Sequence, residues 1–253
     1  MITMSFNVLC AGNKLKKTYW TDRKDLVTGL IRKYRPDTFG LQEAHYRWMN
    51  CICRALPEYG YVGVGRDNGK RLGEFSPVFF LKEKYVPVDS GIFWLSETPE
   101  KPSKGWDGAC TRICSYAVLR EKATGKCFVH FNTHLDHVGP VAQREGAKLI
   151  ADRSLALSDL PAIMTGDFNV EPDSDAFRTV TDAGFEEARF ACGKTDEPKT
   201  FHDFERRAEK DRTLIDFIFV RNGFTVKDYK VITEKPDGRL PSDHYPVIAE
   251  LAF

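Results

Sequence analysis

The sequence carries almost no net charge. Its 37 lysines and arginines are balanced by 36 aspartates and glutamates, so the formal net charge is +1. Proteins that grip long nucleic acids or charged membrane surfaces draw on an excess of one sign, so the overall charge does not indicate a long polyanionic partner. Two short basic clusters, at residues 14–17 and 205–207, are typical of ordinary solvated surface.

A long apolar run and a regular cysteine framework are also missing. No stretch approaches the roughly 20 apolar residues that a membrane-spanning helix needs. The 7 cysteines are odd in number, and Cys51 and Cys53 stand too close together for a zinc knuckle. We therefore expect reduced thiols, a cytoplasmic protein without a membrane span, and no obligate protein partner. An export signal ahead of this sequence is the alternative for its location.

The chain has no linker, low-complexity tract or close internal repeat, so we expect one domain over residues 1–253. Its first part alternates between strand and helix patterns. Thr21 or Asp22 is expected to cap the first helix, and Pro36 ends it. Strands are expected at residues 3–9 and 38–41, and a second helix at residues 46–56.

The middle of the chain changes to short strands separated by Gly, Pro and Asn turns. Strands are expected at residues 61–64, 78–81, 91–95, 113–119 and 128–131. A helix at 141–157, a strand at 162–165, a short helix at 175–180 and late strands at 214–220, 225–232 and 245–251 follow. Because helices recur between strands in both halves, the pattern predicts two similar α/β layers.

Polar side chains stand where apolar strands give way to loops. Gly-Asp-Phe-Asn at residues 166–169 follows one such strand, and Ser-Asp-His at residues 242–244 precedes the last one. Carboxylate and carboxamide oxygens suit Mg²⁺, while imidazole suits a phosphate oxygen or a proton in transfer. Together the two segments indicate metal-assisted hydrolysis. Each alone has a plainer interpretation, because Asp and Asn also cap helices and close turns.

Three further polar residues have two interpretations each. Asp216 lies among large apolar residues, where a carboxylate needs a partner, so it either orients an imidazole or forms an ion pair with Arg212 or Arg221. His134 closes a strand, either as a site residue or as a histidine satisfied by its neighbours. Asp136 either supports His134 or belongs to the loop that follows.

Six short segments run from the first expected strand to the last. They are Ser-Phe-Asn-Val at 5–8, Leu-Gln-Glu-Ala at 41–44, Asn-Thr-His-Leu-Asp at 132–136, Gly-Asp-Phe-Asn at 166–169, Ile-Asp-Phe-Ile at 215–218 and Ser-Asp-His-Tyr-Pro-Val at 242–247. In content and order this series resembles the endonuclease/exonuclease/phosphatase family. The resemblance implies the deoxyribonuclease I-like fold, a four-layered α/β sandwich of two packed mixed β-sheets flanked by helices.

The resemblance also implies a metal-dependent hydrolase of phosphate esters, with Mg²⁺ as the cofactor and Mn²⁺ as an alternative. Glu43 matches the principal metal-binding glutamate of the family, and Asn7 lies beside it. Asp243 matches a further acidic residue of the metal site.

Five matching residues are implied to act on water and phosphate. Asp167 orients or deprotonates the attacking water, and Asn169 contacts the phosphate. His244 faces the scissile phosphate and is oriented by Asp216, while His134 matches an additional histidine of many members. An imidazole beside a phosphate is useful only with its tautomer fixed, which a buried carboxylate does.

Substrate contacts are expected between residues 65 and 112. Arg66 and Glu74 are candidates for the rim of the pocket, with a solvated hairpin loop as the alternative. Trp106 stands in a Gly/Lys/Asp loop, where it is a candidate for stacking on a base or sugar. Arg112 either pairs with a phosphate or forms a structural bridge with Glu74.

We hypothesise a Mg²⁺-dependent phosphoesterase that hydrolyses a phosphodiester or phosphomonoester, in a small molecule, a nucleotide or a short nucleic acid, by direct attack of water. The second candidate is a nuclease on single-stranded or short nucleic acid, since residues 132–136 are similar to the deadenylase group. No long basic insertion is available to grip a duplex. The third is a binding module without catalysis, which the retention of Glu43, Asp167, Asp243 and His244 disfavours.

Overall fold

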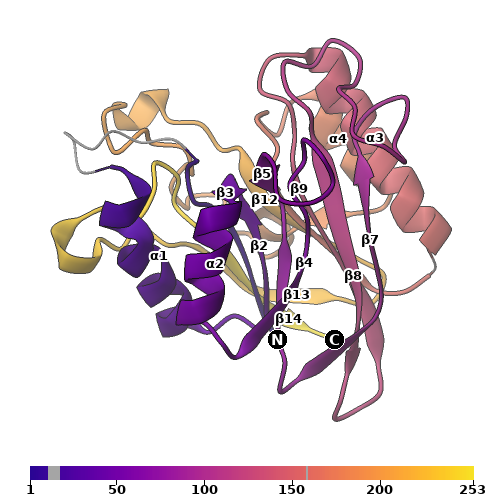
Figure 1. Ribbon diagram of the computed structural model, residues 1–253, viewed down its shortest axis with the longest axis horizontal. Helices are drawn as coiled ribbons and strands as arrows, with labels where there is room; N and C mark the ends of the chain where they lie inside the picture. The colour runs from indigo at the N-terminus through magenta and orange to yellow at the C-terminus, as the bar shows by residue number, and fades with distance from the viewer. Residues whose placement is uncertain (11–17, 158) are drawn as a thin grey trace.

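Two six-stranded sheets pack face to face and carry helices on their outer faces (Figure 1). The computed structural model describes residues 1–10, 18–157 and 159–253, so the basic cluster at residues 14–17 lies outside the described residues. In Figure 1, α1 (Trp20–Tyr34) and α2 (Tyr46–Ala55) cover one side, and α3 (Pro140–Leu157) and α4 (Asp175–Asp182) cover the other. The expected four-layered α/β sandwich is confirmed.

The first sheet has the strand order β13-β14-β1-β2-β6-β4. Its strands are β13 (Thr225–Val231), β14 (Val247–Ala252), β1 (Ile2–Asn7), β2 (Thr38–Gln42), β6 (Val78–Leu81) and β4 (Tyr59–Val62). Only the central pair, β1 and β2, is parallel, and α1 connects the two strands.

The second sheet repeats this plan with the order β11-β12-β10-β9-β8-β7. Its strands are β11 (Glu186–Glu187), β12 (Asp216–Arg221), β10 (Ala162–Asp167), β9 (Cys127–His134), β8 (Ile113–Glu121) and β7 (Tyr85–Trp94). Again only the central pair, β9 and β10, is parallel, and α3 connects it. Parallel strands end on the same side of a sheet, so each sheet gathers the ends of its central strands at one edge.

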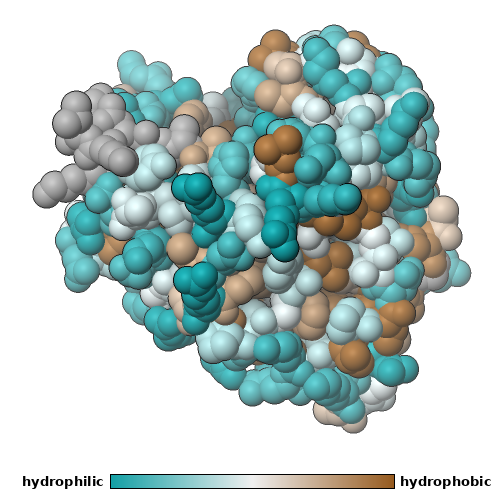
Figure 2. Space-filling model, viewed as in Figure 1, coloured by the Kyte–Doolittle hydropathy of each residue, from teal (hydrophilic) through white to brown (hydrophobic). Residues whose placement is uncertain are grey.

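Shorter elements complete the chain. The two-residue strands β3 (Ala44–His45) and β5 (Glu74–Phe75) pair with each other, and α5 (Ala188–Ala191), η1 (Glu209–Asp211) and η2 (Pro236–Gly238) lie in the second half. In the described part of the chain, no helix combines the length and the apolar character that crossing a membrane requires. Hydrophilic side chains cover most of the face in Figure 2, with hydrophobic ones scattered among them.

Apolar side chains hold the layers together in three clusters. The first joins α1 and α2 to the first sheet, through residues such as Ile31, Trp48 and Phe39. The second joins α3 and α4 to the second sheet, and the third fills space between the two sheets. Burial of these side chains is the main stabilising contribution to the fold.

A buried polar network also connects the two sheets. The Gln42 side-chain amide and the Thr165 hydroxyl both donate to Oδ1 of Asn132, at 2.7 and 3.0 Å, and Nδ2 of Asn132 donates to the Leu41 carbonyl at 2.7 Å. A Cβ atom on Gly40 would lie 2.2 Å from Asn132 Oδ1, so only glycine fits at this crossing. A buried network of this kind fixes how one sheet sits on the other.

Several element boundaries differ from the sequence-based expectation, among them the strand expected at residues 61–64, which is β4 at Tyr59–Val62. Helix α1 begins at Trp20 with Tyr19 as its N-cap and no side-chain cap, so the expected cap by Thr21 or Asp22 is wrong. Strand β7 begins at Tyr85 instead of residue 91, because Pro87 is tolerated beside a bulge in an edge strand. Strand β12 begins only at Asp216, and β14 begins at residue 247 instead of 245.

Candidate active site

The ends of the central strands of both sheets meet around one cavity of about 290 Å³. Asn7 closes β1, Glu43 follows β2, His134 closes β9 and Asp167 closes β10. The cavity is lined by Cys10, Glu43, Arg66, Glu74, Cys110, Arg112, His134, His137, Asp167, Asn169, Phe201, Ile215, Asp243 and His244. The structure thus brings together all but three of the expected site residues in the lining, and two of these three, Asn7 and Asp216, contact it directly.

Asn7 links the two sheets at the floor of the site. Its Nδ2 donates to Glu43 Oε1 at 3.0 Å and to Asp167 Oδ2 at 2.9 Å. Its Oδ1 accepts a hydrogen bond from the Leu9 backbone amide at 2.9 Å. Asn7 therefore holds one carboxylate from each sheet in a fixed relation to the other.

Glu43 is held as a carboxylate at the end of β2. It adopts a left-handed backbone conformation, with φ of 64°, and its Oε2 accepts a hydrogen bond from the Cys10 amide at 2.6 Å. Burial alone would raise its pKa, but the hydrogen bonds from Cys10 and Asn7 outweigh burial and hold the Glu43 pKa below its ordinary value. Glu43 is therefore ionised at neutral pH.

His244 is paired with a buried carboxylate. Its Nδ1 lies 2.9 Å from Asp216 Oδ2, and its Nε2 lies 3.8 Å from Asp167 Oδ2. Burial alone would lower the His244 pKa, but the charges of Asp216 and Asp167 raise it well above the ordinary value. The ring is therefore an imidazolium, and Asp216 pairs with it instead of with Arg212 or Arg221.

Asp167 is fully buried at the centre of the site. Burial, followed by the charge of Asp216, raises the pKa of Asp167 to about 7. Its Oδ1 accepts the backbone N–H of Asn169 at 2.9 Å. The helix that follows, α4, is capped by Ser174, so Asp167 and Asn169 do not serve as its cap.

His134 is a neutral imidazole with an unpaired nitrogen. Burial lowers its pKa well below the ordinary value, and the charges of Arg112 and Arg66 act in the same direction. Its Nε2 lies 3.6 Å from Asp167 Oδ2, and its Nδ1, 3.7 Å from Glu74 Oε2, has no hydrogen-bond partner among the described residues. It is not a histidine satisfied by its neighbours.

Two arginines form a positively charged wall. Arg66 Nη1 lies 2.7 Å from Glu74 Oε2, whereas Arg112 Nη1 lies 4.0 Å from the same oxygen. Arg112 is 5% exposed, and its Nε and Nη1 are buried without a hydrogen bond to any described residue. Its Nη2 lies 3.2 Å from His137 Nδ1. Buried guanidinium nitrogens without partners are suited to an anion entering the cavity.

Asp136 supports the arginine wall instead of His134. Arg112 Nε lies 3.8 Å from Asp136 Oδ2. Burial alone would raise the Asp136 pKa, but four backbone amides outweigh it and lower the pKa to about 2. These amides belong to Ala109, Cys110, Val138 and Gly139.

The acidic groups fit a hard divalent cation. Glu43 and Asp243 line the same cavity, and burial of Asp243, together with the charge of Glu43, raises the Asp243 pKa although His244 opposes this. Mg²⁺ and Mn²⁺ take oxygen ligands of this kind, and a cation would relieve the repulsion between the two carboxylates. Side-chain atoms of Asp167, Asp216 and His244 also lie within 4.8 Å of one another, but His244 Nδ1 is engaged by Asp216.

Trp106 is the one expected site residue that neither lines the cavity nor hydrogen-bonds through its side chain to a described residue that lines it. Its backbone adopts a left-handed conformation, with φ of 46°, and its amide lies 3.2 Å from each Glu97 carboxylate oxygen. This turn places the residue outside the lining. Trp94, by contrast, is buried and donates its indole N–H to the Arg66 carbonyl at 2.7 Å.

Sequence reasoning missed five lining residues: Cys10, Cys110, His137, Phe201 and Ile215. Cys10 and His137 each follow a recognised strand-end residue by three positions, a signal that could have found them. Nothing comparable marks Phe201, whose ring lies 4.7 Å from that of His244 because its loop pairs with the segment before β14.

The model of the Endonuclease/Exonuclease/phosphatase family matches residues 4–244. The chain belongs to this family. Family membership, together with a phosphatase among its structural neighbours, supports a hydrolase of phosphate esters.

Two solved structures of this family resemble the whole chain. The endonuclease/exonuclease/phosphatase from Bacteroides vulgatus is 38% identical, with a TM-score of 0.93 over 100% of this chain and 98% of the other. A mannosyl-6-phosphatase from Bacteroides thetaiotaomicron is 36% identical, with a TM-score of 0.93 over 100% of both chains. Human nocturnin is 25% identical over 276 residues, which cover 97% of this chain but only 61% of nocturnin.

Proposed function

We propose that this family member is a Mg²⁺-dependent phosphoesterase, with Mn²⁺ as an alternative cofactor, that hydrolyses a small phosphomonoester by direct attack of water. We take residues 1–253 to act as one domain. The observation that supports this most strongly is the single cavity shared by Glu43, Asp167, His244 and two arginines.

In this proposal Glu43 and Asp243 hold the metal ion, and Asn7 orients Glu43 through its hydrogen bond. A bound divalent cation would offset negative charge on the phosphate and on the attacking oxygen. Asn7 contributes by position, because its Nδ2 spans Glu43 and Asp167.

Asp167 accepts a proton from the attacking water as the water oxygen bonds to phosphorus and the ester P–O bond breaks, and the leaving alkoxide takes a proton from solvent. The pKa of Asp167, about 7, suits a general base at neutral pH, because the carboxyl is ionised often enough to act and basic enough to take the proton. His244 presents its Nε2–H to a phosphate oxygen, and Asp216 fixes the ring and its charge through Nδ1. Asn169 and His134 border the same space and contact the phosphate.

The substrate is a small phosphate monoester, such as a sugar phosphate. A monoester is close to a dianion at neutral pH, and Arg66 and Arg112 offer it two guanidinium groups in one wall. The volume of about 290 Å³ is at the lower end of small-molecule sites, which run from roughly 300 to 1,000 Å³. The whole-chain likeness to a mannosyl-6-phosphatase supports the same class.

A nuclease on single-stranded or short nucleic acid is the second candidate. Phe201 is the aromatic side chain of the lining that could stack on a base, since Trp106 lies outside it. The seven free thiols further lead us to infer a reducing, cytoplasmic compartment.

A substrate panel tests the proposal. Wild type is assayed with Mg²⁺, with Mn²⁺ and with a chelator on hexose 6-phosphates, bis(p-nitrophenyl) phosphate and a single-stranded oligonucleotide. We expect phosphate release from a hexose phosphate to be fastest and to stop with the chelator. If the oligonucleotide were cleaved fastest, the protein would be a nuclease. If no substrate were turned over in a metal-dependent way, the protein would be a binding module without catalysis.

A further inference from the structure

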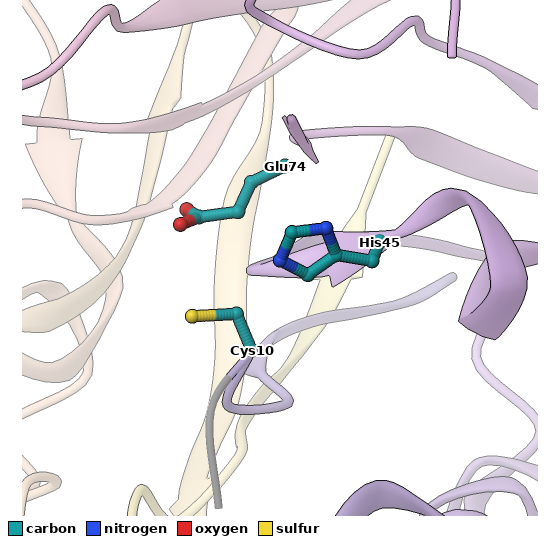
Figure 3. A group of neighbouring side chains, drawn as sticks. All are labelled: Cys10, His45 and Glu74. Atoms are coloured by element: carbon teal, nitrogen blue, oxygen red, sulfur yellow. The ribbon is translucent and has the colours of Figure 1, made fainter. Parts of the chain in front are cut away.

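Cys10, His45 and Glu74 form a second group of metal-binding side chains beside the cavity (Figure 3). One sulfur, one nitrogen and one oxygen atom of these residues all lie within 4.8 Å of one another. In Figure 3 the three side chains come from three separate segments and turn toward a common space. The group mixes sulfur, nitrogen and oxygen, whereas Glu43 and Asp243 offer oxygen alone.

The short ribbon of β3 and β5 places two of these ligands next to each other. His45 and Glu74 are directly opposite in the antiparallel register, as are Ala44 and Phe75. Opposite residues in such a pair project from the same face, with Cβ atoms about 4.5–5.5 Å apart. Ala44 and Phe75 are buried in the first apolar cluster, so His45 and Glu74 project from the other face.

The chain after β1 brings the third ligand to them. Leu9 adopts a left-handed conformation, with φ of 57°, and its amide donates to Asn7 Oδ1 at 2.9 Å. The next amide, that of Cys10, donates to Glu43 Oε2 at 2.6 Å. These two hydrogen bonds fix the turn from which the thiol projects.

His45 and Glu74 offer ligand atoms outside their existing contacts. The Cys10 thiol, by contrast, lies against the Glu43 and Glu74 carboxylates, and burial followed by their charges raises its pKa well above the ordinary value, so a metal ion must displace its proton. The ion pairs of Glu74 with Arg66, Arg112 and His134 all use Oε2, which leaves Oε1 available. In the described part of the chain, no group hydrogen-bonds to either ring nitrogen of His45. The ring is nevertheless held in place, because it packs edge-on against Trp48 at 4.9 Å between centroids.

We propose that Cys10, His45 and Glu74 bind a borderline-soft divalent cation of the Zn²⁺ type, and that this cation inhibits hydrolysis at the neighbouring site. Thiolate, imidazole and carboxylate are the ligands of Zn²⁺, at about 2.3 Å for sulfur and 2.0–2.2 Å for nitrogen and oxygen. Tetrahedral ligands at these lengths are roughly 3.3–3.8 Å apart, so the side chains close by about 1 Å. The Cys10 thiol loses its proton to solvent as the metal–sulfur bond forms.

Inhibition follows from the position of the group, and this part rests on the function proposed above. Cys10 and Glu74 also line the cavity, and the Cys10 amide is bonded to Glu43. A cation bound here places positive charge beside the carboxylate that is proposed to hold Mg²⁺. It also draws Glu74 toward Cys10 and away from Arg66.

Metal binding is measured first, without reference to activity. The full chain in excess Mg²⁺ is titrated with Zn²⁺ by equilibrium dialysis, and with Cd²⁺ while following the ultraviolet charge-transfer band of a cadmium–thiolate bond. We expect one tight site, a loss of affinity of at least about tenfold in His45→Gln, and loss of the band in Cys10→Ser. Cys127→Ser removes a half-buried thiol of the second sheet and is the matched control. It should keep both the Zn²⁺ affinity and the cadmium–thiolate band of wild type.

Equal Zn²⁺ affinity in wild type and His45→Gln, or a cadmium–thiolate band that survives in Cys10→Ser, would overturn the site. Circular dichroism and melting curves verify that both variants fold. If one of the two variants fails to fold, the other decides the test, because His45 and Cys10 are proposed to bind the same metal ion.

Inhibition is measured second, with His45→Gln. His45 lies outside the cavity lining, so this variant keeps its Mg²⁺-dependent rate while the Zn²⁺ concentration for half inhibition rises at least about tenfold. Equal zinc inhibition of wild type and His45→Gln would refute the inhibitory link. If no Mg²⁺-dependent hydrolysis exists at all, the proposed function fails while the dialysis result still decides the metal site.

Discussion

Asp216→Asn separates the two halves of the proposed active site. Asp216 Oδ2 lies 2.9 Å from His244 Nδ1 and makes no hydrogen bond to Glu43 or Asp243. The substitution keeps the shape of the side chain and removes its charge. We therefore expect a large loss of turnover with little change in the affinity for Mg²⁺.

The magnitude follows from the one contact that is lost. A hydrogen bond to a charged group contributes about 1.5–3 kcal/mol, more than a neutral one. Since each 1.36 kcal/mol is about tenfold in rate, kcat should fall by about 10- to 150-fold. The pH dependence changes as well. The charge of Asp216 helps to raise the Asp167 pKa to about 7, so its removal moves the rising limb of kcat/KM toward acid pH.

The assay measures kcat and kcat/KM for phosphate release over a pH series and a Mg²⁺ titration in wild type and Asp216→Asn. Asp173→Asn, at an exposed position after the same strand as Asp167, is the control and should match wild type. An unchanged kcat would refute the role of the pair. A rise of tenfold or more in the Mg²⁺ concentration for half activity would show that Asp216 acts on the metal site instead.

Three further predictions concern the rest of the chain. Burial raises the pKa of Glu187 to about 7, so the neutral carboxyl is compatible with the folded state at acid pH and this stability is lost as the pH rises through 7. Urea unfolding should therefore show that Glu187→Gln is more stable than wild type by about 3 kcal/mol above pH 7, and equally stable near pH 4. Gly40→Ala should lower the free energy of unfolding by about 1–3 kcal/mol or more, because its Cβ would lie 2.2 Å from Asn132 Oδ1, whereas Gly29→Ala in the open interior of α1 should raise it. Arg112→Lys should raise KM about tenfold, whereas Arg120→Lys at an exposed position should leave KM unchanged, because Arg112 lines the cavity with two guanidinium nitrogens that no described residue hydrogen-bonds and Arg120 does not line it. Equal KM values in the two variants would remove Arg112 from the substrate site.

The sequence carries much of the fold because its strand ends are marked. Apolar runs that stop at Asn7, Glu43, His134 and Asp167 predict where buried strands meet loops, and the family resemblance supplies their order and partners. The parallel pairs β1–β2 and β9–β10 then gather these ends at one edge, as the sandwich requires. A carboxylate in an apolar run needs a partner, but only the family resemblance implies that the partner of Asp216 is His244, as the structure has it.

The walls of the cavity were less predictable. Arg66 and Arg112 were expected near substrate, but their relation to Glu74 depends on distances that no local pattern encodes. Trp106 lies outside the lining because a left-handed turn sets its direction, and Phe201 reaches His244 only through the pairing of two distant loops. Long-range contacts of this kind follow from the assembled fold, because loop conformations are set by their surroundings more than by their own residues.

In the proposed mechanism, one cavity hydrolyses a phosphate ester by water that Asp167 activates. The measurement that tests it most directly is the Mg²⁺-dependent rate of phosphate release from a hexose 6-phosphate by wild type, Asp167→Asn and the control Asp173→Asn. We expect the rate to fall about 100-fold or more in Asp167→Asn, within the range for removing a general base, and not to fall in the control. Equal rates in all three proteins would contradict this mechanism.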